Sequence, residues 1–117
     1  MKIVWGTPTI RGLHPELVRN IVAFDLDSQK VKNELRLYFP QSSLLTLSRN
    51  NIIRDAFKWD ADWVIMIDDD ISIKDNNFFN IMVETAYKFN APLVGLPCRL
   101  GVSDEIIFNF ADKDAER

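Results

Sequence analysis

One stretch of the sequence, an apolar run that leads directly into three adjacent aspartates, constrains the fold more than any other. Residues Trp63 to Ile67 are all apolar, and Asp68, Asp69 and Asp70 follow them without a break. A short apolar run of this kind is typical of a strand that is buried on both faces. Because open parallel sheets bind ligands at the carboxyl ends of their strands, we expect the three acids at a ligand-binding edge.

The three carboxylates predict a site for a divalent cation. Adjacent negative charges repel one another unless water or a cation lies among them, and Mg²⁺ and Mn²⁺ favour carboxylate oxygens. Residues two apart in an extended segment point to the same side, so Asp68 and Asp70 are expected to face one ligand together. Asp69 would then face away or cap the turn. The alternative interpretation is a solvated acidic turn after a strand.

Length and composition indicate one ordinary globular domain. The chain has 117 residues, of which 47% are hydrophobic and 26% charged, so we expect a single domain over residues 1–117. The formal net charge of −3, with scattered Lys and Arg, argues against nucleic-acid binding. A single cysteine, Cys98, allows no internal disulfide. No apolar run approaches the ~18 residues of a membrane span, and no signal-peptide pattern is present, so a cytoplasmic location is expected.

Short apolar runs alternate with segments of helical periodicity along the chain. These runs predict four strands, near Ile3–Trp5, Leu35–Phe39, Val64–Ile67 and Leu93–Leu96. Strands that alternate with helices imply a parallel sheet covered by helices. The predicted fold is therefore α/β, with a Rossmann-like, mostly parallel sheet and helices on both faces.

Three helices are predicted beside these strands. The first begins at His14 and Pro15, since proline suits the first helical turn. Ser48 is expected to cap the second helix, with Arg49 and Asn50 in its first turn, and Asp75 to cap the third. Apolar residues at helical spacing predict the buried faces, which comprise Leu17, Val18, Ile21 and Val22, then Ile52, Ile53, Ala56 and Phe57, then Phe78, Phe79, Met82, Val83, Ala86 and Tyr87. Asn90 suits the end of the third helix.

Two further groups of residues are candidates for the same edge as the acids. Thr7–Pro8–Thr9 follows the first strand, and it shares that edge if the first and third strands are neighbours. Ser48–Arg49–Asn50–Asn51 combines the free N–H groups of a helix start with a guanidinium, and both suit phosphate. Taken singly, the first group is also an ordinary turn, and arginine near a helix start is common on surfaces.

Taken together and in order, these motifs resemble those of nucleotide-sugar glycosyltransferases of the GT-A fold. The residues that carry the resemblance are Thr7–Pro8–Thr9, Ser48–Arg49–Asn50, Asp60–Ala61–Asp62–Trp63 and Asp68–Asp69–Asp70. The short glycosyltransferase-like proteins of phages and bacteria are the most similar type, and there Pro97–Cys98–Arg99 would match a segment after the next strand. The resemblance covers roughly Lys2 to Arg99.

The resemblance implies a domain that binds a nucleoside diphosphate sugar. By analogy, Asp70 would hold Mn²⁺ or Mg²⁺ between the two phosphates, and Asp68 would contact the ribose or the metal, with Asp69 in the same nucleotide-binding motif. Thr7–Pro8–Thr9 would lie along the nucleoside, and Arg49–Asn50 would lie near the nucleotide or the sugar. The metal would neutralise the leaving diphosphate during transfer of the sugar to an acceptor, which could be a glycan, a protein or a lipid.

The chain departs from this family in two respects. The strand–helix unit that usually precedes the Arg-Asn helix is compressed or missing. Little sequence follows Arg99, so we expect the acceptor-binding half, which supplies the general base in inverting members, to be lacking. Asp104 and Glu105 are the nearby acids, and nothing distinguishes them from surface acids, so no catalytic residue is assigned. A second copy of the chain or a partner could complete the site.

Other proteins also carry acids after a buried strand. Response-regulator receivers have an acidic pair after their first strand, whereas these acids lie in the middle of the chain. Haloacid-dehalogenase-like phosphatases have Asp-x-Asp, a small residue and Thr, which residues 68–72 match loosely. The alternative that stays open is a non-catalytic module that binds a nucleotide sugar, a metal or a protein partner.

Overall fold

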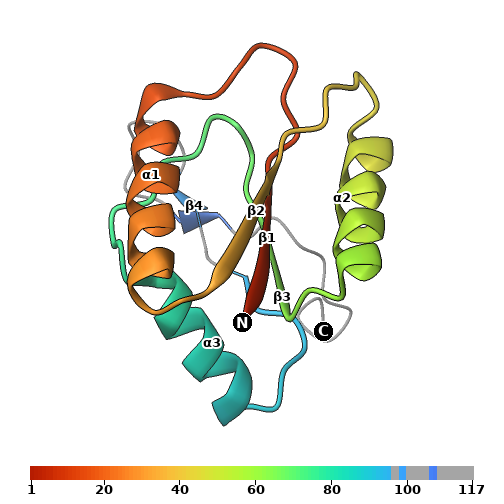
Figure 1. Cartoon of the computed structure of the whole chain (residues 1–117). Coiled ribbons are helices and arrows are strands. Elements are labelled where there is room, and N and C mark those ends of the chain that lie inside the picture. The colour runs from red at the N-terminus through yellow and green to blue at the C-terminus, as the bar shows by residue number, and fades with distance from the viewer. Residues whose placement is uncertain (96–97, 100–105, 108–117) are drawn as a thin grey trace, which may run out of the picture. The chain divides into compact units, whose positions relative to one another are not determined.

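The computed structural model describes residues 1–95, 98–99 and 106–107, which form two compact units, Met1–Asn76 and Asn77–Arg117 (Figure 1). The first unit contains strands β1 (Lys2–Gly6), β2 (Glu34–Tyr38) and β3 (Trp63–Met66), and helices α1 (Pro15–Lys30) and α2 (Leu45–Trp59). The second contains helix α3 (Phe78–Lys88) and two short antiparallel strands, β4 (Cys98–Arg99) and β5 (Ile106–Ile107). In the described part of the chain, no helix is long and apolar enough to cross a membrane.

The first unit is built on a parallel sheet with strand order β2-β1-β3. Val4 of β1 aligns with Arg36 of β2 on one side and with Val64 of β3 on the other. The chain passes from β1 to β2 through α1 and then crosses back past β1 through α2. Because such crossovers are right-handed, the two helices lie on opposite faces of the sheet, as Figure 1 shows. The predicted α/β fold, Rossmann-like with helices on both faces, is confirmed.

β1 is the central strand, and its side chains reach both layers of helix. Ile3, Val4 and Trp5 are completely buried. Trp5 packs against Phe24 of α1, with 5.4 Å between the ring centroids. Val4 lies on the other face and packs with Ile52 of α2. Full burial of an aliphatic side chain such as Val4 contributes about 1.5–3 kcal/mol, so β1 anchors both helices.

β3 occupies an edge of the described sheet, which corrects the prediction that it is buried on both faces. Trp63, Val64 and Ile65 are only half-buried, and Met66 is 40% exposed. The predicted strand itself is confirmed, with a shift of one residue at each end. An apolar run indicates that a segment is a strand, but it does not reveal how many neighbours that strand has.

The predicted strand over Leu93–Leu96 is wrong for its described residues. Residues 93–95 are irregular, and Leu93 is 87% exposed, while Leu96 lies outside the described residues. Pro92, just before this segment, has no N–H to donate to a ladder, and Gly95 within it weakens any strand. These two residues outweigh the short apolar run.

Two of the predicted helix boundaries are confirmed. His14 caps α1, where its Nδ1 accepts a hydrogen bond from the N–H of Glu16 at 3.2 Å, and Pro15 begins the helix. Asn90 follows the end of α3 in the left-handed conformation, with φ of 49°. The N–H of Ala91 then donates to the carbonyl of Ala86 at 2.8 Å, which closes the helix end.

Two predicted helix starts are wrong. α2 begins at Leu45, so Ser48 lies inside the helix rather than at its cap, and Arg49 lies beyond its first turn. The hydroxyl that bonds to the backbone just before α2 is that of Ser42, which accepts a hydrogen bond from the N–H of Leu44 at 3.1 Å. α3 begins at Phe78, so Asp75 does not cap it.

The predicted buried helix faces are only partly correct. Residues confirmed as buried are Leu17, Ile21, Ile52, Ala56, Phe78, Phe79 and Ala86. Residues predicted as buried but exposed are Val18, Val22, Ile53, Phe57 and Tyr87. In the first unit the sheet has three strands, and each helix therefore buries a narrower stripe than its apolar periodicity suggests.

Candidate functional site

The carboxyl ends of β1 and β3 bring two of the predicted motifs to one edge of the sheet. These strands are parallel neighbours, with Gly6 aligned with Met66. Thr7–Pro8–Thr9 follows Gly6 directly, and Asp68–Asp69–Asp70 begins just beyond Met66. The condition for a shared edge, that the first and third strands are neighbours, is therefore met.

The three acids lie in a turn, and this corrects the expectation that they are extended. The N–H of Ile71 donates to the carbonyl of Asp68 at 3.4 Å, which places Asp69 and Asp70 at the two central positions of the turn. Strict alternation of side chains therefore does not apply to Asp68 and Asp70. Both are exposed, whereas Asp69 is half-buried. Exposed carboxylates are accessible to a metal ion that a substrate also ligates.

Arg49 of α2 meets the acidic turn directly. Its Nη2 lies 3.4 Å from Oδ1 of Asp68, and the two side chains are 48% and 54% exposed. Two motifs that are 19 residues apart in sequence are thus in contact. An ion pair this exposed contributes at most about 1 kcal/mol to the free energy of unfolding. The contact is therefore informative because it shows that the two motifs are close, and it adds little stability. Asn50, the next residue, is exposed as well.

Both threonines of the Thr7–Pro8–Thr9 loop are buried, and their hydroxyls accept hydrogen bonds from neighbouring residues of the chain. Thr7 is completely buried, and its Oγ1 accepts a hydrogen bond from Nε1–H of Trp5 at 3.0 Å. Thr9 is 7% exposed, and its Oγ1 accepts from the N–H of Gly12 at 2.9 Å. The N–H groups of Thr7 and Thr9 donate to the carbonyls of Tyr38 and Pro40. Half-buried Pro8 is the member of this motif with the most accessible side chain.

Gly6 and Ser48 shape the edge, and reasoning from the sequence predicted neither the close approach at Gly6 nor the burial of Ser48. A Cβ atom on Gly6 would lie 2.5 Å from Cγ2 of Ile52, so only glycine allows α2 to approach the end of β1 this closely. Ser48 lies one turn before Ile52 on the same helix face. It is completely buried, and its hydroxyl has no hydrogen-bond partner among the described residues. Glycine at a strand end was the available signal, because it often marks close backbone approach.

Helix α1 fastens the loop that carries the acids. The backbone N–H of His14 donates to the carbonyl of Asp69 at 3.0 Å. Further along the loop, the side-chain amide of Asn20 exchanges two hydrogen bonds with the backbone of Ile73. Nothing in the sequence indicated this pairing, because an asparagine on a helix is ordinarily a solvated residue.

The donor set at this edge fits a metal ion that protein and substrate share. Within the residues that the structure describes, no group of three His, Cys, Asp or Glu side chains is arranged to hold a metal by itself. Mg²⁺ commonly takes only one or two carboxylates, with substrate phosphates and water completing its shell. Exposed Asp68 and Asp70 match that smaller requirement.

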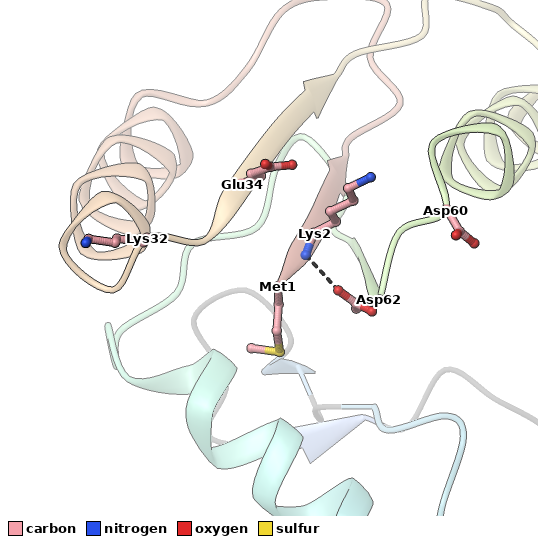
Figure 2. Close-up of a pocket in the computed structure, with 6 residues that line it drawn as sticks. All are labelled: Met1, Lys2, Lys32, Glu34, Asp60 and Asp62. Atoms are coloured by element: carbon pink, nitrogen blue, oxygen red, sulfur yellow. Dashed lines mark hydrogen bonds between the residues drawn. The ribbon is translucent and has the colours of Figure 1, made fainter.

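Two hollows are lined by residues other than the three aspartates. One, of about 360 Å³, is at the amino edge and is lined by Met1, Lys2, Lys32, Glu34, Asp60 and Asp62 (Figure 2). Figure 2 shows these side chains spread around the hollow rather than converging on one point, and the backbone N–H of Lys2 donates to Oδ2 of Asp62 at 2.8 Å. The other, of about 280 Å³, is lined by Tyr38 and polar residues of α2.

We place the candidate site at the carboxyl edge rather than in either hollow. Neither hollow contains a residue predicted to ligate the metal or to bind the nucleotide, although Asp60 and Asp62 of the resemblance line the first and Asn51 lines the second. Parallel sheets bind ligands beyond the carboxyl ends of their strands, and well-formed binding pockets are concave and mostly apolar with a few convergent polar groups. The amino-edge hollow instead has charges of both signs and no convergence.

Comparisons of the chain with protein-family models, curated proteins and solved structures found no match. The functional argument therefore depends on the motifs and on their geometry. Pro97, Asp104 and Glu105 lie outside the described residues, whereas Cys98 and Arg99 of the last family-like segment form β4.

Proposed function

We propose that this chain binds a nucleoside diphosphate sugar through Mn²⁺ or Mg²⁺ at the carboxyl edge of β1 and β3, and that it acts as a glycosyltransferase. The observation that carries the proposal is the contact of 3.4 Å between Arg49 and Asp68. It brings together the two motifs on which the resemblance to GT-A glycosyltransferases depends most. A solvated acidic turn would not require an arginine from another element.

Each residue at the edge has a role in this proposal that suits its chemistry. Asp70 and Asp68 would ligate the metal, with Asp69 completing the motif, and Pro8 with its flanking threonines would border the nucleoside. The bound metal would neutralise the leaving diphosphate. Arg49, which pairs with Asp68 in this structure, presents a planar guanidinium that suits a phosphate oxygen pair.

The acceptor and the general base stay unassigned in this proposal. An acceptor could be a glycan, a protein or a lipid, and a second copy of the chain or another partner could contribute to its binding. A well-placed general base contributes about 10²–10⁴-fold to a transfer reaction. Transfer without such a base would be slow even where donor binding is tight.

A non-catalytic nucleotide-sugar or metal-binding module is the second candidate. The observation that favours it is the openness of the edge, since Asp68 and Asp70 are exposed and neither hollow reaches them. Transfer enzymes generally exclude water from the reacting centre. An open edge suffices for binding.

Calorimetry with a panel of nucleoside diphosphates, each with and without Mn²⁺, tests the proposed function. We expect binding that requires Mn²⁺ and that is lost in Asp70→Asn and weakened in Asp68→Asn. Asp60→Asn is the matched control, because Asp60 lines the amino-edge hollow and asparagine tolerates its φ of 62°. Equal binding by the wild type and Asp70→Asn would refute the site.

Measurement of released nucleoside diphosphate separates the two candidates. The chain is incubated with Mn²⁺, nucleotide sugars and an acceptor library. Acceptor-dependent release that Asp70→Asn abolishes supports the glycosyltransferase. Metal-dependent binding without any release supports the non-catalytic module.

A further inference from the structure

We propose that Asn20 is a positioning residue, whose side-chain amide holds the acidic loop in the arrangement that takes the metal ion and the diphosphate. The inference rests on the proposed function, because it concerns the same Asp68–Asp69–Asp70 turn. It adds a residue that touches neither ligand and that lies on α1, outside all of the sequence motifs.

The contact between Asn20 and Ile73 is a closed pair of hydrogen bonds. Nδ2 of Asn20 donates to the carbonyl of Ile73 at 2.7 Å, and the N–H of Ile73 donates to Oδ1 of Asn20 at 2.9 Å. One planar amide thus satisfies both backbone groups of a residue that is 53 positions away in sequence. Both bonds are partly buried, so water competes for them less than for a surface contact.

A second bond fastens the same loop on the other side of Asp70. The N–H of His14 donates to the carbonyl of Asp69 at 3.0 Å. The loop is therefore attached to α1 at Asp69 and again at Ile73, with only residues 70–72 between the two points. Figure 1 shows this loop, in green after β3, leaving the sheet on the side of α1.

The helix that carries both attachment points is itself firmly packed. Leu17 and Ile21, which flank Asn20 along α1, are buried at 0% and 6% exposure. Phe24 of the same helix packs on Trp5 of the central strand. Hydrogen bonds from a packed helix fix the backbone position of a loop more accurately than the loop can by itself. A metal-binding turn requires such accuracy.

The acidic turn needs such a clamp for a physical reason. Its three carboxylates repel one another, and the last backbone bond of this segment to β1 is the one from the N–H of Ile67 to the carbonyl of Gly6 at 3.2 Å; no strand is assigned over residues 67–77. Residues beyond the ligands that orient a metal site typically change metal affinity by about 10–100-fold when they are mutated. Loss of the Asn20 amide should therefore lower the affinity for the metal ion, although the side chains of Asp68 and Asp70 are themselves unchanged.

The test compares Asn20→Ala and Asn20→Asp with Gln29→Ala in the full chain. Gln29 is a matched control because it lies on the same helix and its side-chain amide donates to Asp25 of that helix at 3.1 Å. Asn20→Asp keeps an acceptor for the N–H of Ile73 and loses the donor to its carbonyl. Circular dichroism first checks that each variant is folded. The hydrogen-exchange rate of the Ile73 amide then reports whether the Asn20–Ile73 hydrogen bonds are intact. Titration with Mn²⁺ alone, followed by electron paramagnetic resonance, measures the Mn²⁺ affinity of the site.

We expect faster exchange at Ile73 and an approximately tenfold loss of Mn²⁺ affinity in Asn20→Ala, with a smaller loss in Asn20→Asp and none in Gln29→Ala. If Asn20→Ala does not fold, the Asn20→Asp comparison decides the result. Unchanged Mn²⁺ affinity in a folded Asn20 variant, together with loss of affinity in Asp70→Asn, overturns the role of Asn20 and leaves the proposed function intact. Absence of Mn²⁺ binding by the wild type overturns both.

Discussion

Gly6 at the end of β1 and Ile52 of α2 are so closely packed that a Cβ atom on Gly6 would lie 2.5 Å from Cγ2 and 2.6 Å from Cδ1 of Ile52. This approach sets the height of α2 above the sheet. It also sets where the preceding turn of the helix lies, and that turn carries Ser48 and Arg49. A side chain at residue 6 would have to displace Ile52, one turn along α2 from the residues that reach the carboxyl edge.

Gly6→Ala is expected to destabilise the fold. The added methyl group must displace Ile52 in a packed region, and overpacking of this kind costs about 1–3 kcal/mol. Urea denaturation measures the change in the free energy of unfolding. Gly95→Ala is the control, because among the described residues nothing beyond the chain neighbours lies within 4 Å of a Cβ at that position, and its effect should stay within about 0.5 kcal/mol. Equal effects of the two substitutions would contradict the close approach.

Arg49→Ala is expected to affect binding much more than stability. The ion pair with Asp68 is about half-exposed at both ends, so its loss should change the free energy of unfolding by less than about 1 kcal/mol. If Arg49 serves phosphate, the same change should weaken Mn²⁺-dependent binding of a nucleoside diphosphate by about tenfold or more, as expected for a lost charge-assisted hydrogen bond of about 1.5–3 kcal/mol. Calorimetry and urea denaturation separate the two effects.

Arg49→Lys provides the comparison for that experiment. Lysine keeps the positive charge but lacks the planar fork of donors. Partial recovery of affinity would indicate a contribution from charge alone, and full recovery would argue against bidentate contact. Binding by Arg49→Ala that equals wild type would remove Arg49 from the site.

Ser48→Ala is expected to leave the free energy of unfolding unchanged or to raise it. The Ser48 hydroxyl is buried without a hydrogen-bond partner among the described residues, and such a group carries a desolvation cost of about 1–3 kcal/mol. Alanine removes the hydroxyl and also favours the helix. The free energy of unfolding should rise by up to about 1 kcal/mol. A clear loss of stability would show that the hydroxyl has a stabilising partner.

Thr7→Val is expected to have the opposite effect. Thr7 is equally buried, but its Oγ1 accepts the hydrogen bond from Nε1–H of Trp5 at 3.0 Å. Valine has a similar shape and cannot accept, so a buried donor loses this acceptor at a cost of about 1–3 kcal/mol. Denaturation of Thr7→Val beside Ser48→Ala provides the test, and a neutral Thr7→Val would show that the bond contributes little.

Local signals in the sequence were sufficient for the strands and for several helix ends. The strands β1, β2 and β3 were predicted to within a residue or two, because apolar β-forming runs bounded by turn residues depend on neighbours in sequence. His14 and Pro15 at the start of α1, and Asn90 beyond α3, were also correct for local reasons. The alternation of these elements sufficed for the parallel α/β fold.

Only the tertiary structure decided which of these elements is central and which residues meet. β1, not the longer apolar run that forms β3, has two strand neighbours, and β3 lies at an edge. Ser48 is a buried helix residue rather than a cap because α2 begins at Leu45. The pairs Arg49–Asp68 and Asn20–Ile73 join residues that are 19 and 53 positions apart. Strand partners and side-chain contacts at such separations depend on packing between elements, and no local pattern of residues encodes them.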